Sequence, residues 1–122
     1  MDAFPAYFPL AGKKVVIAGT GEPAEAKLRL FAGCPAQVVH IQGPEALLPG
    51  SYSGALLAFI ADADEAFATG AAAAARAARA LVNVADRPAL CDFTTPSVID
   101  RGEVVAAIRT GGASPMLATM LR

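Results

Sequence analysis

The stretch KVVIAGTGEPA, residues 14–24, joins a short apolar run to a glycine-rich turn. The apolar run is rich in β-branched residues and predicts a buried parallel strand. Gly19 permits a tight turn, Gly21 lets the backbone approach a pyrophosphate, and Ala24 is small enough for a helix to pack closely on the strand. The stretch therefore predicts a dinucleotide-binding loop, and a tight turn without a ligand is the alternative.

Apolar runs and helical patterns alternate along the rest of the chain. We expect strands over 36–41, 55–61, 80–86 and 103–110, and helices over 22–32, over the alanine-rich 64–80 and after residue 114. Residues 43–54 and 86–96 are expected to be loops. Strands that alternate with helices predict an α/β fold, which here is a Rossmann-like open parallel sheet with helices on both faces.

The composition excludes several classes of protein. The 122 residues suffice for one domain with a core, and 55% of them are hydrophobic. A net charge of -1 gives no electrostatic signature of nucleic-acid or anionic-membrane binding. No apolar run reaches the ~18 residues of a membrane span, and the first residues lack the order of a signal peptide. Cys34 and Cys91 have no metal-ligand spacing, so we expect a protein of the reducing cytoplasm.

Many dinucleotide sites have an acidic residue at the end of the second strand, where it binds the ribose. His40, Ile41 and Gln42 occupy these positions here. This rule therefore does not distinguish NAD from NADP.

Three further stretches resemble one known family. The stretch VNVADRPALCDFTTPSVIDRG (82–102) resembles the NVVD…CDF…P…DR segment of the precorrin-2 dehydrogenase and sirohydrochlorin ferrochelatase family, the N-terminal module of siroheme synthase. The stretch RTGGASPMLATMLR (109–122) is similar to the family's S-[ST]-G-G-x-S-P-x-L-A-x-x-L-R, and residues 8–31 are similar to its opening strand, glycine loop and helix. These motifs in this order are more specific than a glycine loop alone.

The resemblance implies NAD-dependent oxidation of precorrin-2 to sirohydrochlorin, with hydride transfer to NAD⁺ and loss of protons. Some members of the family also insert Fe²⁺ to give siroheme, and the sequence leaves this activity open. The resemblance assigns the acid/base role to Asp86. A carboxylate at the carboxyl edge of the sheet could accept the protons released in either step. From the residues alone, an aspartate that begins an Asp-x-Pro turn is the alternative.

The resemblance also implies which residues contact the cofactor. The cofactor-binding residues are expected to be Gly19, Thr20, Gly21, Glu22, Pro23, Gly43 and Pro44. The family's A-T-D-D after the next strand is here Ala61-Asp62-Ala63-Asp64. We include Asp62 because its carboxylate could bond a ribose hydroxyl; repulsion of the pyrophosphate is the alternative.

For the tetrapyrrole substrate, the resemblance implies Asn83 and Thr110 as contacts. A strand-end hydrogen bond is an equal alternative for Asn83. The substrate has eight carboxylates, and Arg87, Arg101 and Arg109 could receive some of them or be solvated surface residues.

The resemblance divides the chain into an NAD-binding Rossmann-like domain over 1–102 and the start of a dimerisation and substrate-binding segment over 103–122. A homodimer is therefore expected. The stretch between the second and third strands is shorter than the family usually has. The alternative to an active enzyme is thus a relative that binds NAD or tetrapyrrole without turnover.

Overall fold

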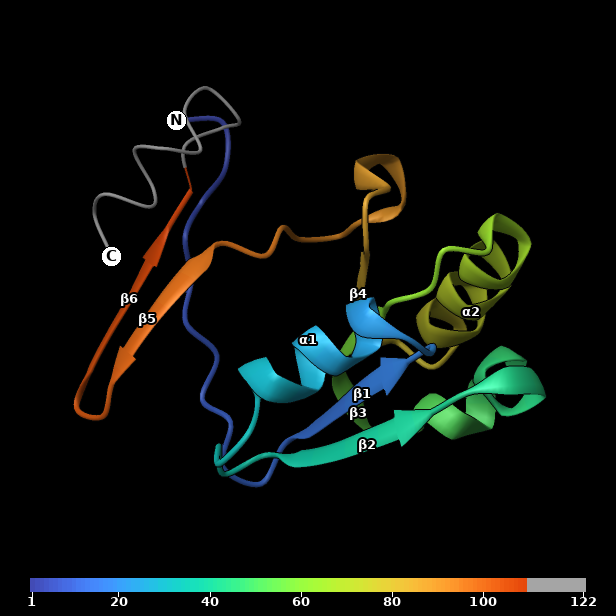
Figure 1. The fold of residues 1–122 in the computed structure, drawn as a ribbon, viewed down its shortest axis with the longest axis horizontal. Coiled ribbons are helices and arrows are strands. Elements are labelled where there is room, and N and C mark those ends of the chain that lie inside the picture. The colour runs from blue at the N-terminus through green and yellow to red at the C-terminus, as the bar shows by residue number, and fades with distance from the viewer. Residues whose placement is uncertain (110–122) are drawn as a thin grey trace.

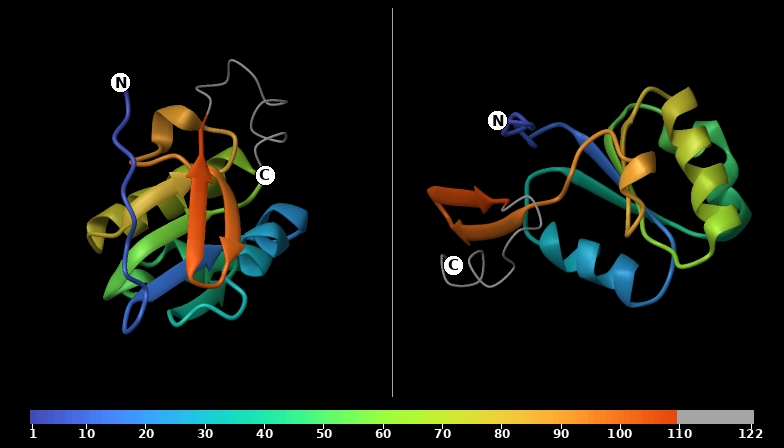
Figure 2. Two further views of the ribbon diagram at one scale, coloured as in Figure 1. Left: turned by 90° about the vertical axis from the view of Figure 1, so that its left-hand side faces the viewer. Right: turned by 90° about the horizontal axis from the view of Figure 1, so that it is seen from above.

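The structure of the chain, a computed structural model, describes residues 1–109 and is built around a parallel sheet (Figure 1). The sheet has the order β2-β1-β3-β4. Its strands are β1 (Lys14–Ala18), β2 (Gln37–Ile41), β3 (Ala55–Ile60) and β4 (Leu81–Val84). Helices α1 (Glu22–Leu30) and α2 (Glu65–Ala77) cover opposite faces of it (Figure 2). The predicted Rossmann-like sheet with helices on both faces is confirmed.

The central strand β1 is buried on both sides, which explains its continuous apolar run. Val15 and Ile17 face α1 and belong to the core cluster that includes Ala24. Val16 and Ala18 point to the opposite face, where they pack in one cluster with the buried alanines of α2. The two hydrophobic cores thus fix both helices against the strand that ends at the glycine loop.

The connection between β2 and β3 is more ordered than the predicted loop over 43–54. It contains two 3₁₀ helices, η1 (Gly43–Leu47) and η2 (Pro49–Tyr52). Tyr52 is fully buried in the core cluster of α2, and its hydroxyl donates a hydrogen bond to the Ala46 carbonyl oxygen at 2.6 Å. Burial raises the pKa of Tyr52 to about 12. The short connection is therefore a packed part of the domain.

The strand predicted over 103–110 lies outside the parallel sheet. Residues Val104–Ile108 form β6, which pairs antiparallel with β5 (Ser97–Arg101) in a separate hairpin. The outer edge of β4 is occupied by Asp92, whose backbone N–H donates to the Val82 carbonyl oxygen at 2.7 Å and whose carboxylate accepts from the Val82 N–H at 2.9 Å. Because these edge groups are already bonded, a fifth strand cannot pair with them there.

The β5–β6 hairpin projects from the sheet, and the N-terminal segment runs beside it (Figures 1 and 2). The Tyr7 hydroxyl donates to the Val105 carbonyl oxygen at 3.3 Å, and Arg109 lies 3.5 Å from the Asp2 carboxylate. The domain boundary predicted after residue 102 falls in the turn of this hairpin and stays a prediction. Among residues 1–109, none of the helices has the length and apolar character needed to cross a bilayer.

Candidate functional site

The glycine loop passes between the carboxyl ends of β2 and β3. The Gly19 N–H donates to the Ile41 carbonyl oxygen at 3.0 Å. The φ of Gly19 is 129°, and a Cβ atom there would lie 2.1 Å from the carbonyl oxygen of Ala61. Gly21 has a φ of 79°, but a Cβ there would meet only Pro23 Cδ, at 3.8 Å. Gly19 is thus required by the fold itself, whereas the space beside Gly21 is open for a ligand.

The N-terminus of α1 fits an anionic group. No side chain caps this helix, and its first intrahelical bond runs from the Glu25 N–H to the Gly21 carbonyl oxygen at 3.0 Å. The backbone N–H groups of Glu22 and Ala24 precede that bond and have no acceptor within the helix. A pyrophosphate is an acceptor suited to such a helix start.

Glu22 is an acid in this first turn, but its carboxylate pairs with Arg29 further along α1. The hydrogen bond from Arg29, together with its positive charge, lowers the pKa of Glu22. The side chain is therefore directed along the exposed side of the helix. The Glu22 carboxylate is thus paired with Arg29.

Asp62 lies close to the glycine loop. It follows β3, and its Cβ would be 3.3 Å from a Cβ on Gly19. One carboxylate oxygen accepts the Asp64 N–H at 2.9 Å, in the turn that leads into α2. Of the predicted nucleotide contacts, Pro23 and Asp62 line one hollow of about 250 Å³.

Gly43 and Pro44 are placed beyond the end of β2, at the start of η1, and line neither of the two hollows of this site. His40 connects β2 to the glycine loop, with its Nε2 atom 2.7 Å from the Gly19 carbonyl oxygen. The end of β2 therefore borders the loop, as expected for the adenosine side of a dinucleotide site.

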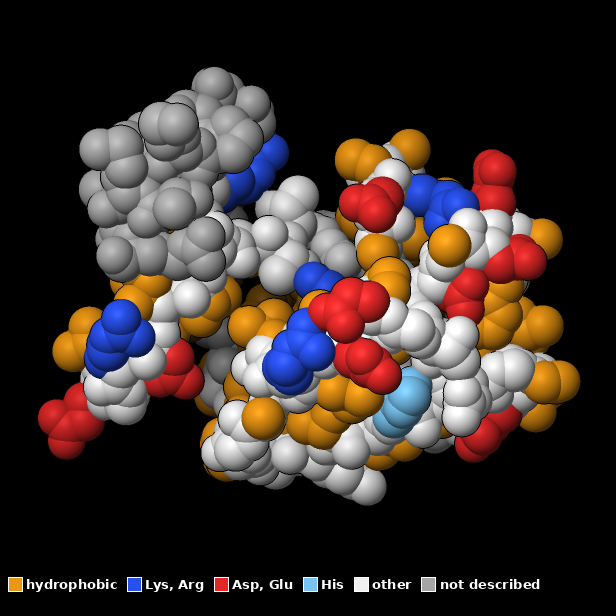
Figure 3. Space-filling model, viewed as in Figure 1, with side chains coloured by type: hydrophobic (Ala, Val, Ile, Leu, Met, Phe, Trp, Pro, Cys, Tyr) orange, Lys and Arg blue, Asp and Glu red, His pale blue; other side chains and the backbone are white. Residues whose placement is uncertain are grey.

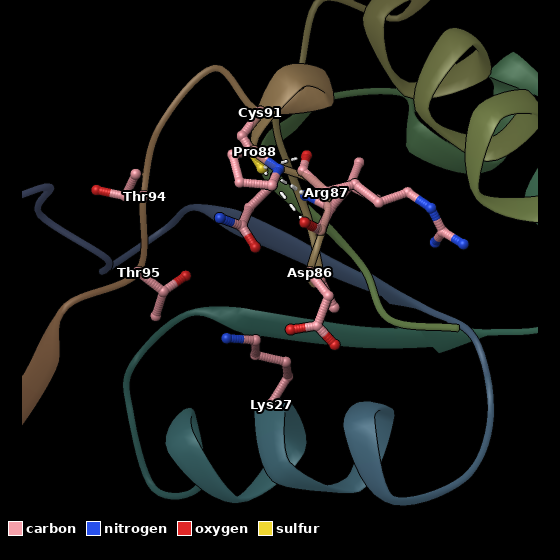
Figure 4. Close-up of a pocket in the computed structure, with 10 residues that line it drawn as sticks. Lys27, Asp86, Arg87, Pro88, Cys91, Thr94 and Thr95 are labelled. Carbon is pink, nitrogen blue, oxygen red and sulfur yellow. Dashed lines mark hydrogen bonds between the residues drawn. The ribbon is translucent and has the colours of Figure 1, made fainter. Parts of the chain in front are cut away.

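Asp86 lines two adjacent hollows at the carboxyl edge of the sheet, the larger of which is shown in Figure 4. It follows β4 with a φ of 60°, a left-handed conformation that aspartate and asparagine adopt more readily than most residues. One hollow is the one lined by Pro23 and Asp62, and the other, of about 280 Å³, is lined by Asn83 and Lys27. The structure therefore brings the predicted carboxylate, nucleotide contacts and Asn83 to one edge.

Lys27 was not predicted from the sequence. It extends from α1 toward Asp86 in the larger hollow, and its Nζ atom lies 5.3 Å from the centroid of the Phe59 ring (Figure 4). Burial lowers the pKa of Lys27, and the smaller effects of nearby Asp86 and Cys91 oppose this shift. Its spacing from Ala24, three residues earlier on the sheet-facing side of α1, is the sequence signal that could have identified it.

The NVAD motif (83–86) and the CDF motif (91–93) are joined by hydrogen bonds. Asn83 is 7% exposed, and its amide N–H donates to the Phe93 carbonyl oxygen at 2.9 Å. The Val84 N–H donates to Cys91 Sγ at 3.1 Å. Asn83 therefore makes the strand-end hydrogen bond and also lines the larger hollow. The two alternatives considered for this residue are compatible.

The three candidate arginines bond mainly to nearby protein groups. Arg87 donates to the carbonyl oxygens of Asp62 at 3.4 Å and Ala63 at 3.2 Å, which ties the loop after β4 to the loop after β3. Arg101 donates to the Asp100 carbonyl oxygen at 3.3 Å, and Arg109 lies beside Asp2, on the hairpin side of the molecule. Thr110, the other predicted substrate contact, lies outside the described residues.

Charged side chains of both signs are interspersed on the face shown in Figure 3. Within residues 1–109, no group of three or more histidine, cysteine or acidic side chains is arranged to hold a metal ion. The carboxyl edge of the sheet thus brings together the Asp86 carboxylate, the Lys27 ammonium group and the uncapped start of α1.

Comparison with known proteins identifies a matching family and relatives that share one name. The family described as "Putative NAD(P)-binding" matches residues 6–97. Siroheme synthases from Nitrosomonas eutropha and Pseudomonas aeruginosa are 32% and 34% identical to the chain over 142 and 140 residues, and these matches cover 100% of the chain. The chain spans 30% of the length of these relatives.

Among solved structures, "SirC, precorrin-2 dehydrogenase" matches with a TM-score of 0.77 and 19% identity. The match covers 98% of this chain and 67% of that one, and it shows a shared fold. Together with the match over residues 6–97, the glycine loop and the parallel sheet establish that the chain belongs to this NAD(P)-binding family.

Proposed function

We propose that the protein oxidises precorrin-2 to sirohydrochlorin in siroheme biosynthesis, with NAD⁺ as hydride acceptor and Asp86 as the acid/base residue. This proposal rests on the position of Asp86, which lines both the hollow beside the glycine loop and the larger hollow that Asn83 also lines. The relatives named siroheme synthase and the structural neighbour named precorrin-2 dehydrogenase support the substrate class.

The oxidation requires one acceptor for a hydride and one for a proton. Oxidation of the macrocycle removes two electrons and one hydrogen as a hydride, and a second hydrogen leaves as a proton. When bound, the nicotinamide ring supplies the hydride acceptor. The Asp86 carboxylate accepts the proton, and Asn83, held by its bond to the Phe93 carbonyl oxygen, orients the substrate in the larger hollow.

The nucleotide would be held mainly by backbone. The open N–H groups at the start of α1 suit the pyrophosphate, and the residues from Gly19 to Pro23 border that position. In this proposal the Asp62 carboxylate, close to Gly19, accepts a ribose hydroxyl, and Gly43 and Pro44, at the start of η1, contact the adenosine. We propose NAD as the cofactor, and separate titrations with NAD⁺ and NADP⁺ test that preference.

Iron insertion is a second activity that the same carboxylate could serve, because the pyrrole N–H protons must also leave before the metal binds. A protein that binds NAD or tetrapyrrole without turnover is the other candidate. The matches favour it in one respect: the alignments extend over 142 positions, whereas this chain has 122 residues, so the relatives hold segments without a counterpart here.

We propose a second copy of the chain as the protein partner. The N-terminal segment and the hairpin expose large apolar side chains close together: Phe4, Tyr7, Phe8, Val104 and Val105. Burial of such a group in a dimer interface is favourable. Sedimentation of the full chain tests this proposal. The free thiols Cys34 and Cys91 are consistent with a reducing cytoplasm as the proposed compartment.

The test of the proposed activity is an anaerobic assay with freshly generated precorrin-2. We expect sirohydrochlorin and NADH to form in equal amounts, only when both NAD⁺ and the protein are present. Binding of both ligands without product would contradict the enzyme and support the binding-only alternative. Failure to bind either ligand would contradict both candidates.

A further inference from the structure

We propose that Lys27, assisted by the Thr95 hydroxyl, binds a carboxylate group of the substrate beside Asp86. The proposal rests on the proposed function and adds a specific substrate-binding position to it. Both side chains line the larger hollow, and in Figure 4 Lys27 points toward Asp86 from α1 while the Thr95 hydroxyl points toward the same hollow.

The positive charge of Lys27 is not balanced by an ion pair with another described residue. Within residues 1–109, Lys27 is in none of the ion pairs, which involve Arg29, Arg76 and Arg109. The titratable groups that act on it are Asp86 and Cys91, and their effect is smaller than that of desolvation. An ammonium removed from water without a bonded anion is costly, so an anionic ligand group in this hollow would be stabilised there.

The position of the Lys27 side chain is constrained by aromatic rings. Its Nζ atom lies 5.3 Å from the centre of the Phe59 ring, within the range of a cation–π interaction. Phe59 is itself fixed between Phe31, at 5.2 Å between ring centres, and Phe93, at 5.5 Å. The ammonium is therefore held at the wall of the hollow by packed aromatic rings.

The Thr95 hydroxyl is a second donor in the same hollow. Its oxygen is buried and has no hydrogen-bond partner within the described residues. A buried hydroxyl without a partner is unfavourable, and a ligand oxygen in the same hollow would supply one. Ammonium and hydroxyl donors together match a carboxylate, which accepts several hydrogen bonds.

The arginines are less suited to this task. Arg87 also lines the hollow, but its guanidinium already donates to the backbone of the loop after β3. Lys27 is thus the cation of this hollow that makes no hydrogen bond to another described residue. A tetrapyrrole with carboxylate side chains that enters beside Asp86 would place one of them within reach of Lys27.

Binding of sirohydrochlorin, measured anaerobically by absorbance titration, tests the proposal. We expect Lys27→Gln to weaken binding at least tenfold, an estimate of about the size of a charge-assisted hydrogen bond, while Lys27→Arg stays within about threefold of the wild type. Lys13→Gln removes the same charge at an exposed residue before β1 and should change affinity less than about twofold. NAD⁺ affinity should be unchanged in all three variants.

Thr95→Val tests the hydroxyl separately. Because the free protein offers this hydroxyl no partner among residues 1–109, the variant should unfold at the same temperature as the wild type or higher. Sirohydrochlorin binding should still weaken about fivefold. Unchanged affinity in Lys27→Gln or in Thr95→Val would overturn the proposal.

A measurement on the wild-type protein covers the case in which Lys27→Gln does not fold. The chain has three lysines, Lys13, Lys14 and Lys27, so ¹³C-dimethylated lysine signals can be assigned by single Lys→Arg variants. The pKa of Lys27 should rise when sirohydrochlorin binds, and an unchanged pKa would overturn the proposal. Wild-type protein that does not bind sirohydrochlorin would overturn the proposed substrate as well, so the two failures are distinguishable.

Discussion

The close approach of Gly19 to β3 predicts that Gly19→Ala is far more destabilising than the same change at Gly21. An alanine Cβ at residue 19 would lie 2.1 Å from the Ala61 carbonyl oxygen, and the φ of 129° is strained for any residue with a side chain. The strain costs about 1–3 kcal/mol and the overpacking about 1–3 kcal/mol more. We expect a loss of about 3–5 kcal/mol in the free energy of unfolding.

Gly21 and Gly12 provide matched comparisons. Their φ values are 79° and 76°, but a Cβ at Gly21 meets only Pro23 Cδ at 3.8 Å and a Cβ at Gly12 meets nothing within 4 Å. Each Gly→Ala change should therefore cost only about 1–2 kcal/mol. Each Gly→Ala change also lowers the conformational entropy of the unfolded chain, which raises the free energy of unfolding. This effect is the same for all three variants and cancels in the comparison.

Urea unfolding followed by circular dichroism measures the difference. With a dependence of about 1–3 kcal/mol per molar urea, Gly19→Ala should lower the midpoint by roughly 2 M, and Gly21→Ala by less than about 1 M. Equal midpoints for the two variants would refute the conclusion that residue 19 is glycine because of β3. NAD⁺ binding should be impaired in folded Gly21→Ala, because the loop is displaced from the pyrophosphate position.

Three further predictions concern the packed connection and the sheet edge. Tyr52→Phe leaves the buried Ala46 carbonyl oxygen without its 2.6 Å bond and should cost about 1–3 kcal/mol in urea unfolding; no loss would contradict that bond. Because the pKa of Tyr52 is raised in the folded state, its contribution to the free energy of unfolding is present below pH 10 and is lost as the pH rises toward about 12. The melting temperatures of the wild type and Tyr52→Phe should therefore converge between pH 9 and 12. Asp92→Ala removes the acceptor of the Val82 N–H and should cost about 2 kcal/mol. Asp100→Ala, near the end of β5, removes an exposed acceptor of the Gly102 N–H and should cost less than about 1 kcal/mol.

The elements buried on both sides could be predicted from the sequence. β1 and β3 appear as short continuous apolar runs and β4 as an apolar run interrupted by Asn83, and their positions follow from that pattern. The 3₁₀ helices between β2 and β3 could not be predicted, because they depend on the burial of Tyr52 against α2. The hairpin was misassigned because the edge of β4 is closed by a side chain, that of Asp92, which leaves no periodic signal.

The candidate site was predicted in part. The glycine loop is visible in the sequence because its residue types are demanded by backbone geometry, as at Gly19. Asp86 came from the resemblance, since an isolated Asp-x-Pro sequence has a simpler interpretation as a turn. Lys27 was missed because its significance lies in contacts with Phe59 and in its nearness to Asp86, which are distant in the sequence.

The most direct test of the account is a single anaerobic turnover of precorrin-2 with saturating NAD⁺ by the Asp86→Asn protein. Asparagine tolerates the left-handed backbone at this residue, so the fold and both binding steps should be retained. Without the carboxylate, NADH formation should slow by at least about 100-fold, while Asp100→Asn in the hairpin stays at the wild-type rate. A rate within a few fold of the wild type in Asp86→Asn would contradict the role of Asp86 as the base.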